Sequence, residues 1–153
     1  MSLTSTLKKN KLETAFKSAA EEVIYYLELK NQYYEKFFQM TKKFIQKAGA
    51  NQWEGLDFFV ENRERVLKII QYFDNKISHV LEKLPTKVSA DNASRERVRE
   101  IMEERNEWGK HIVEQDLELL SKLEEVRNET IKELKKTQDL DSKISSYTNT
   151  TRR

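Results

Sequence analysis

Turn-forming residues are so scarce that they exclude most fold classes for this chain. Its 153 residues include three glycines and one proline. A sandwich, a barrel or a βαβ fold needs a turn every 8–12 residues or so, and these residues mark such turns. Charged residues form 35% of the chain and apolar residues 37%, a balance typical of long helices. The sequence therefore predicts an all-α fold.

Three long segments carry apolar residues at alternating spacings of three and four. This period predicts helices over about 10–48, 52–84 and 90–137. Short connections between long helices favour antiparallel neighbours, because a few residues cannot carry the chain along the length of a helix. We expect one elongated antiparallel three-helix bundle over 1–137, followed by a short C-terminal helix or tail.

Local signals mark the expected helix ends. Asn10 and Asn51 are each followed three residues later by a glutamate, the pattern of an N-terminal capping box. Gly49 is placed as the glycine that follows a helix, and Pro85 ends the second helix. The third helix is expected to begin near Ser89 or Asp91.

Residues 138–153 are rich in serine and threonine and are expected to form a mobile or reversibly docked tail. Leu140, Ile144 and Tyr147 lie at helical spacing within it and share one face of a short helix. They are the candidate regulatory residues of this tail.

Two charges fall on the expected inner faces of the first two helices. In an antiparallel pair that turns near residue 50, Lys30 and Asp74 lie nearly level. A buried charge needs such a partner. Alternatively, the long stems lie at the edge of the interface and the charges reach water.

The residues that carry most enzyme chemistry are absent or isolated. The chain has no cysteine, and its two histidines, His79 and His111, lie off the apolar stripes. His111 has Glu107 and Glu114 within one turn, but a di-iron bundle site needs two such motifs and further inward glutamates. No glycine-rich phosphate loop or serine elbow is present. We expect no metal, no cofactor and no enzymatic activity.

Charge and hydropathy restrict the expected cellular location of the protein and the classes of partner that it binds. The net charge is +2, and Glu96 and Glu100 interleave the arginines at 95, 97 and 99, a pattern typical of a solvated helix face. Nucleic-acid binding is therefore not expected. No stretch approaches the ~18 apolar residues of a membrane span. A cytoplasmic protein without membrane insertion is expected.

The first two helices carry more apolar surface than one interface needs. On the first helix it spreads over roughly 200°, against the ~100° stripe of a helix packed on one core. Either each helix contacts two neighbours, or a groove beside these helices accepts an amphipathic helix from another protein. The candidate partner-binding residues are Tyr25, Leu29, Phe38, Phe58, Ile69 and Tyr72.

Part of the chain resembles a known family. A first helix ends in the small-residue turn Ala48-Gly49-Ala50, and a Trp53-x-x-Leu56 start and the run Arg63-Glu64-Arg65-Val66-Leu67 follow. The tail carries Lys143-Ile144-Ser145-Ser146-Tyr147. These motifs are similar to those of the FliT-type flagellar export chaperones, and the related FlgN-type chaperones are similar at the same level.

The resemblance implies a cytoplasmic chaperone of the flagellar type III secretion pathway. Such a chaperone binds an amphipathic helical segment of a filament-cap or hook–filament junction protein and delivers it to the export ATPase or gate. It also implies that the last helix is a regulatory cover. Two alternatives stay open, a structural coiled-coil or bundle adaptor in a constitutive assembly and a partner-binding bundle outside secretion.

Overall fold

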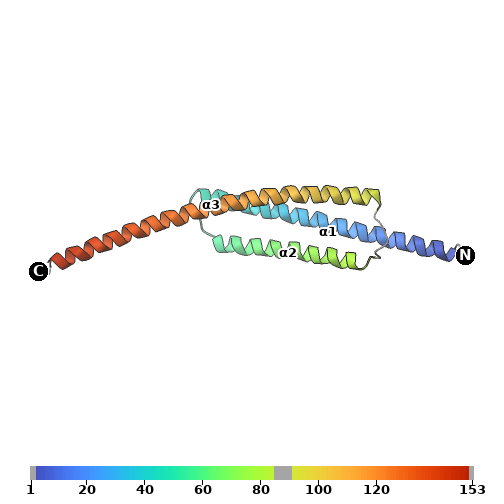
Figure 1. The fold of residues 1–153 in the computed structure, drawn as a ribbon, viewed down its shortest axis with the longest axis horizontal. Coiled ribbons are helices and arrows are strands. Elements are labelled where there is room, and N and C mark those ends of the chain that lie inside the picture. The colour runs from blue at the N-terminus through green and yellow to red at the C-terminus, as the bar shows by residue number, and fades with distance from the viewer. Residues whose placement is uncertain (1–2, 85–90, 152–153) are drawn as a thin grey trace. The chain divides into compact units, whose positions relative to one another are not determined.

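The computed structural model describes residues 3–84 and 91–151, without the side chains at positions 12, 13, 16, 150 and 151. Three helices occupy almost all of this part, α1 (Leu3–Gly49), α2 (Leu56–Glu82) and α3 (Asn92–Thr151), and it contains no strand. Figure 1 labels them. The all-α prediction is therefore confirmed. The expected stop at Pro85 and the expected start at Ser89 lie outside the described residues.

The chain divides into two compact units, residues 1–115 and 116–153. The division between these units differs from the boundary after residue 137 that the sequence predicts. The helix α3 contributes to both units, so its two parts are treated separately below.

The predicted start of the first helix is wrong. Asn10 lies inside α1, which begins at Leu3, and its carbonyl oxygen accepts a hydrogen bond from Thr14 Oγ1 at 2.8 Å. Residues 3–9 contain no glycine or proline that would oppose the helix. The helix therefore continues through the cap pattern toward the N-terminus.

The connection between α1 and α2 also differs from the expectation. Gly49 is still helical, and the left-handed positions are Asn51 (φ 56°) and Gly55 (φ 79°). Asparagine tolerates this conformation better than most residues, and glycine adopts it freely. Because Asn51 forms the turn, it does not cap α2, which begins at Leu56 after Gly55. Trp53 consequently lies before α2 and not within it.

The start of α3 agrees with the sequence. Asp91 Oδ1 accepts a hydrogen bond from the backbone N–H of Ser94 at 2.8 Å, the geometry of an N-cap, and the helix begins at Asn92. Hydrogen bonding from the Ser94 side chain and then from its backbone N–H lowers the pKa of the Asp91 carboxyl below its ordinary value, because both stabilise the ionised form.

The helices α1 and α2 pack against each other along aromatic side chains. Phe44 stacks on Phe59 with ring centroids 4.1 Å apart, and Tyr33 contacts Phe73 at 5.5 Å. Residues with higher numbers on α1 thus contact residues with lower numbers on α2, so the two helices are antiparallel. Phe44, Phe59 and Phe73 are all buried, as is Phe37.

Two cations lie at the interface between α1 and α2, and the sequence analysis predicted one of them, Lys30. Lys30 is 4% exposed and forms an ion pair with Asp74, whose side chain is 51% exposed. The guanidinium of Arg63 lies over the Phe37 ring, 4.5 Å from its centroid. The pairing of Lys30 with Asp74, one of the two alternatives left open by the sequence, is therefore observed.

The buried row of α2 is narrower than its apolar pattern indicates. Phe59, Ile70 and Phe73 are buried, whereas Val60 and Leu67, which belong to the longest apolar repeat of the segment, are each about half exposed. One face of a helix contacts one neighbour, so a repeat that drifts around the helix cannot be covered along its full length by α1.

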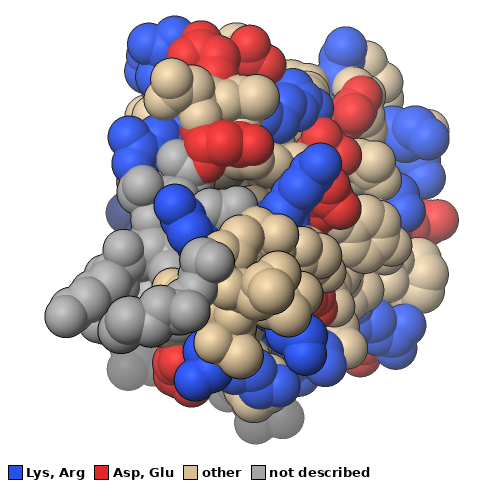
Figure 2. All heavy atoms as spheres, turned by 90° about the vertical axis from the view of Figure 1, so that its right-hand side faces the viewer, with Lys and Arg blue, Asp and Glu red and all other residues tan. Residues whose placement is uncertain are grey.

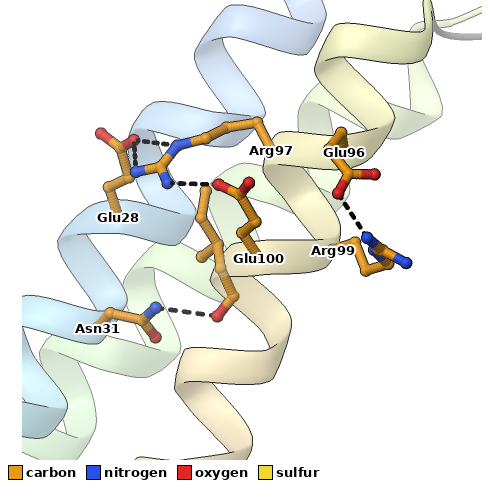
Figure 3. Close-up of polar contacts among 7 residues, drawn as sticks. Glu28, Asn31, Glu96, Arg97, Arg99 and Glu100 are labelled. Atoms are coloured by element: carbon orange, nitrogen blue, oxygen red, sulfur yellow. Dashed lines mark hydrogen bonds and ion pairs between the residues drawn. The ribbon is translucent and has the colours of Figure 1, made fainter.

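Within residues 1–115, the first part of α3 contacts α1 through polar groups. Arg97 binds Glu28 at 2.7 Å, and Asn31 Nδ2 donates to the carbonyl oxygen of Ile101 at 3.0 Å (Figure 3). The bonds to Glu28 and then to Glu100 raise the pKa of Arg97 above its ordinary value. Residue numbers increase along both α1 and the first part of α3 from one contact to the next, so these two segments run parallel.

The second part of α3, in residues 116–151, is helical to Thr151. The sequence predicts an end of this helix near Thr137, because serine and threonine are typical of loops. In the structure such hydroxyls bond to the helix backbone, as Thr148 Oγ1 does to the Ile144 carbonyl at 2.9 Å. The three tail residues Leu140, Ile144 and Tyr147 are exposed.

Candidate functional site

A groove of about 720 Å³ lies between α1 and α2, beside the turn that joins them. Four apolar side chains line it, and the remaining wall is polar. The apolar ones are Met40, Phe44, Phe58 and Phe59, and the polar wall consists of Gln32, Glu35, Lys36, Gln39, Lys43, Lys47, Glu54 and Asn62, with Gly55.

Two neighbouring phenylalanines of α2 have different roles in the groove. Phe59 is 5% exposed and stacks on Phe44, so it belongs to the floor. Phe58 is 65% exposed. Consecutive helical residues differ by about 100° in direction, which places Phe58 at the edge of the interface while Phe59 enters it. The groove thus presents an aromatic ring that is mostly exposed.

Aromatic surface is also present farther along the same pair of helices. Tyr25 contacts Tyr26 at 5.5 Å, Tyr26 contacts Phe73 at 6.0 Å, and Phe73 contacts Tyr72 at 5.8 Å. Tyr25 and Tyr72 are themselves 57% and 54% exposed. Tyr25 and Phe44 mark a length of about 28 Å along α1 at 1.5 Å per residue, room for about five turns of a partner helix.

The structure brings together some, not all, of the predicted partner-binding residues. Phe58 lines the groove, and Tyr25 and Tyr72 are linked through the ring contacts above. At about 100° per residue, Leu29 shares the side of α1 that faces the groove, and Ile69 shares the edge of α2 with Phe58. Both are half-buried.

Phe38 lies elsewhere. Its ring contacts Trp108 at 5.5 Å and His111 at 6.0 Å, both on α3. Its backbone carbonyl accepts a hydrogen bond from Gln115 Nε2 at 3.0 Å. The apolar excess on this flank of α1 is therefore used in the contact with α3, as expected for a helix with two neighbours.

Three lysines of the groove wall were missed by the sequence analysis. Lys36, Lys43 and Lys47 all line the groove from α1. Their spacing of seven and four residues is a helical repeat and could have indicated a common face. The signal was weak because lysines at such spacing are frequent on solvated helices.

The histidines form no metal centre with their neighbours. Among residues 3–84 and 91–151, no group of three or more His, Asp or Glu side chains is placed to hold an ion. His111 lies against Phe38 and Trp108, with Nδ1 3.9 Å from a carboxylate oxygen of Glu114. In the same residues, no helix is long and apolar enough to cross a membrane.

Charges of both signs are mixed on the face drawn in Figure 2. Lysine and arginine side chains alternate there with aspartate and glutamate, around a central area of other residues. This face presents no continuous basic surface of the kind that binds a nucleic-acid backbone.

Comparisons with protein-family models, with curated proteins and with solved structures found no match for this chain.

Proposed function

We propose that this chain is a non-enzymatic binding protein that captures an amphipathic helix of another protein in the groove between α1 and α2. The observation that carries the proposal is the apolar groove itself, edged by Phe58 with 65% of its surface exposed. A helix whose apolar stripe covered Phe58 and Met40 would remove this surface from water.

The more specific proposal is a cytoplasmic export chaperone. The turn at residues 48–50 and the Trp53-x-x-Leu56 motif resemble those of FliT- and FlgN-type proteins. The bound segment would then belong to a flagellar filament-cap or hook–filament junction protein. Delivery to the export ATPase or gate would follow.

We also propose that α1, α2 and the first part of α3 form an antiparallel three-helix bundle. The contacts of α1 with both other segments support this arrangement. Amide exchange measured by NMR tests it, because residues 92–115 should be protected together with α1 and α2. Rapid exchange of 92–115 alone would contradict it.

Co-expression with the cap and junction proteins of the source organism tests the export function. We expect one of them to co-purify, and Phe58→Ser to abolish the complex. Val60→Ser is the matched control, since Val60 is also exposed on α2 but does not line the groove. Equal loss in both variants, or no complex with any flagellar protein, would contradict the proposal.

A structural adaptor is the second candidate, and one observation favours it. In residues 116–151 several large apolar side chains are more than half exposed, among them Leu117, Leu120 and Leu134. A permanent partner would cover them. This function predicts that a stoichiometric partner co-purifies from the native source and depends on these leucines, not on Phe58.

A further inference from the structure

A strip of positive charge borders the apolar floor of the groove. Lys36, Lys43 and Lys47 fall within about 40° of one another around α1 at 100° per residue, and Met40 lies immediately beside them. The strip extends for about 16 Å along the helix axis, or three turns. It thus forms one long wall of the groove.

These lysines have no carboxylate partner among residues 3–84 and 91–151. The ion pairs of α1 in this part of the chain involve Lys30 and Glu28, not the strip. The ammonium of Lys36 lies over the Tyr33 ring, 4.6 Å from its centroid, which holds that side chain along the helix. The positive charge of the strip is therefore available to a partner.

From this wall we infer the chemistry of the partner that the proposed function requires: an acidic amphipathic helix. Its apolar stripe lies on Met40, Phe44, Phe58 and Phe59, and glutamates or aspartates along one flank, repeated every turn over three turns, face the lysines. The inference rests on the proposed function and specifies its partner. Glu35 and Glu54 also line the groove and disfavour partner carboxylates placed against them.

A protein partner suits this wall better than a nucleic acid does. The lysines border an apolar floor, and a phosphate backbone would leave Phe58 and Met40 in water. A nucleic-acid site also needs a broader basic surface than three lysines flanked by two glutamates.

Two synthetic helical peptides of about 20 residues, which span about 30 Å, test the inference. They share one apolar stripe and differ only in the flank, which carries glutamate in one and lysine in the other. Binding to the full chain is measured by titration calorimetry at about 50 mM and about 500 mM NaCl. We expect the acidic peptide to bind about ten-fold more tightly at low salt, and the preference to shrink at high salt because the pairs are exposed.

Variants of the full chain assign the preference to the strip. K36E/K43E/K47E should reverse it, so that the lysine peptide binds more tightly. The matched control K8E/K9E/K11E changes the net charge equally at exposed positions of α1 outside the groove and should keep the preference. Circular dichroism checks that both variants stay helical, since all six lysines are exposed.

The outcomes separate the two proposals. Equal binding of both peptides, with both weakened by Phe58→Ser, would overturn the acidic partner and keep the groove. Binding of neither peptide, or binding that ignores Phe58→Ser, would overturn the groove as well. Tighter binding of a single-stranded oligonucleotide than of the acidic peptide, lost in K36E/K43E/K47E, would overturn the inference in favour of nucleic acid.

Discussion

Lys30 and Asp74 form an ion pair across α1 and α2 in which the lysine is buried and the aspartate is half exposed. Removing the lysine and removing the aspartate should therefore lower the free energy of unfolding by different amounts. An unpaired buried cation has lost its hydration, whereas an unpaired Asp74 remains in contact with water.

The first prediction follows from this difference. Asp74→Ala should destabilise the fold by at least about 2 kcal/mol, because it leaves a buried charge uncompensated. Lys30→Met keeps the volume of the stem and should cost less than about 1 kcal/mol. Urea denaturation of both variants shows which substitution lowers the free energy of unfolding more. An equal or larger loss in Lys30→Met would contradict this order, because only Asp74→Ala leaves the buried lysine unpaired.

The second prediction compares adjacent residues of the groove. Phe59→Ala should cost about 3–5 kcal/mol, because it removes a buried ring stacked on Phe44. Phe58→Ala should change the unfolding free energy by less than about 0.5 kcal/mol, as usual for an exposed position. Thermal denaturation of the two variants tests this. A strongly destabilised Phe58→Ala protein would place that ring in the core and remove the edge of the groove.

The third prediction concerns pH at the start of α3. The folded protein lowers the pKa of Asp91 through its bond to Ser94, so the ionised cap contributes stability above pH ~4, the range of an unperturbed aspartate. This contribution is lost as the pH falls through the lowered pKa. We expect amide exchange at Ser94 and Arg95, corrected for the intrinsic pH dependence, to accelerate on acidification. Asp91→Asn keeps a capping oxygen without a titrating group and should abolish this acceleration. The same acceleration in Asp91→Asn would assign it to another group.

The fourth prediction addresses the C-terminal residues. If the exposed face of Leu140, Ile144 and Tyr147 competes with the partner for the groove, changing all three to serine should tighten binding of the acidic peptide, since the groove is then free more of the time. Titration of the full-length variant tests this. Unchanged affinity would assign the tail no role, and weaker binding would make it part of the site.

The sequence predicts the helices well because their apolar period is long and continuous. Their ends are harder to predict. The sequence predicts Gly49 as the glycine that follows the first helix, but glycine is also compatible with the last helical turn, and the left-handed position falls on Asn51. Asparagine and glycine occur both at helix caps and in turns, so only the path of the next helix distinguishes the two roles.

The polar contacts between α1 and α3 were not predictable from the pattern. Asn31 and Gln115 each donate a hydrogen bond from one helix to a backbone carbonyl of the other, at 3.0 Å in both cases. Such a bond depends on the register of two helices about 70 residues apart, which no local repeat specifies. The lysine wall of the groove was missed for a similar reason, since its neighbours Phe58 and Phe59 belong to another helix.

The placement of the groove beside the turn has a consequence for how the chain folds. Its walls come from two helices joined by a few residues, so closing it requires little loss of chain entropy, whereas the contact of Asn31 with Ile101 closes a segment of 70 residues. Contacts that are local in sequence form earlier than distant ones. We therefore expect the α1–α2 hairpin, with the walls of the groove, to form during synthesis before the contacts with α3.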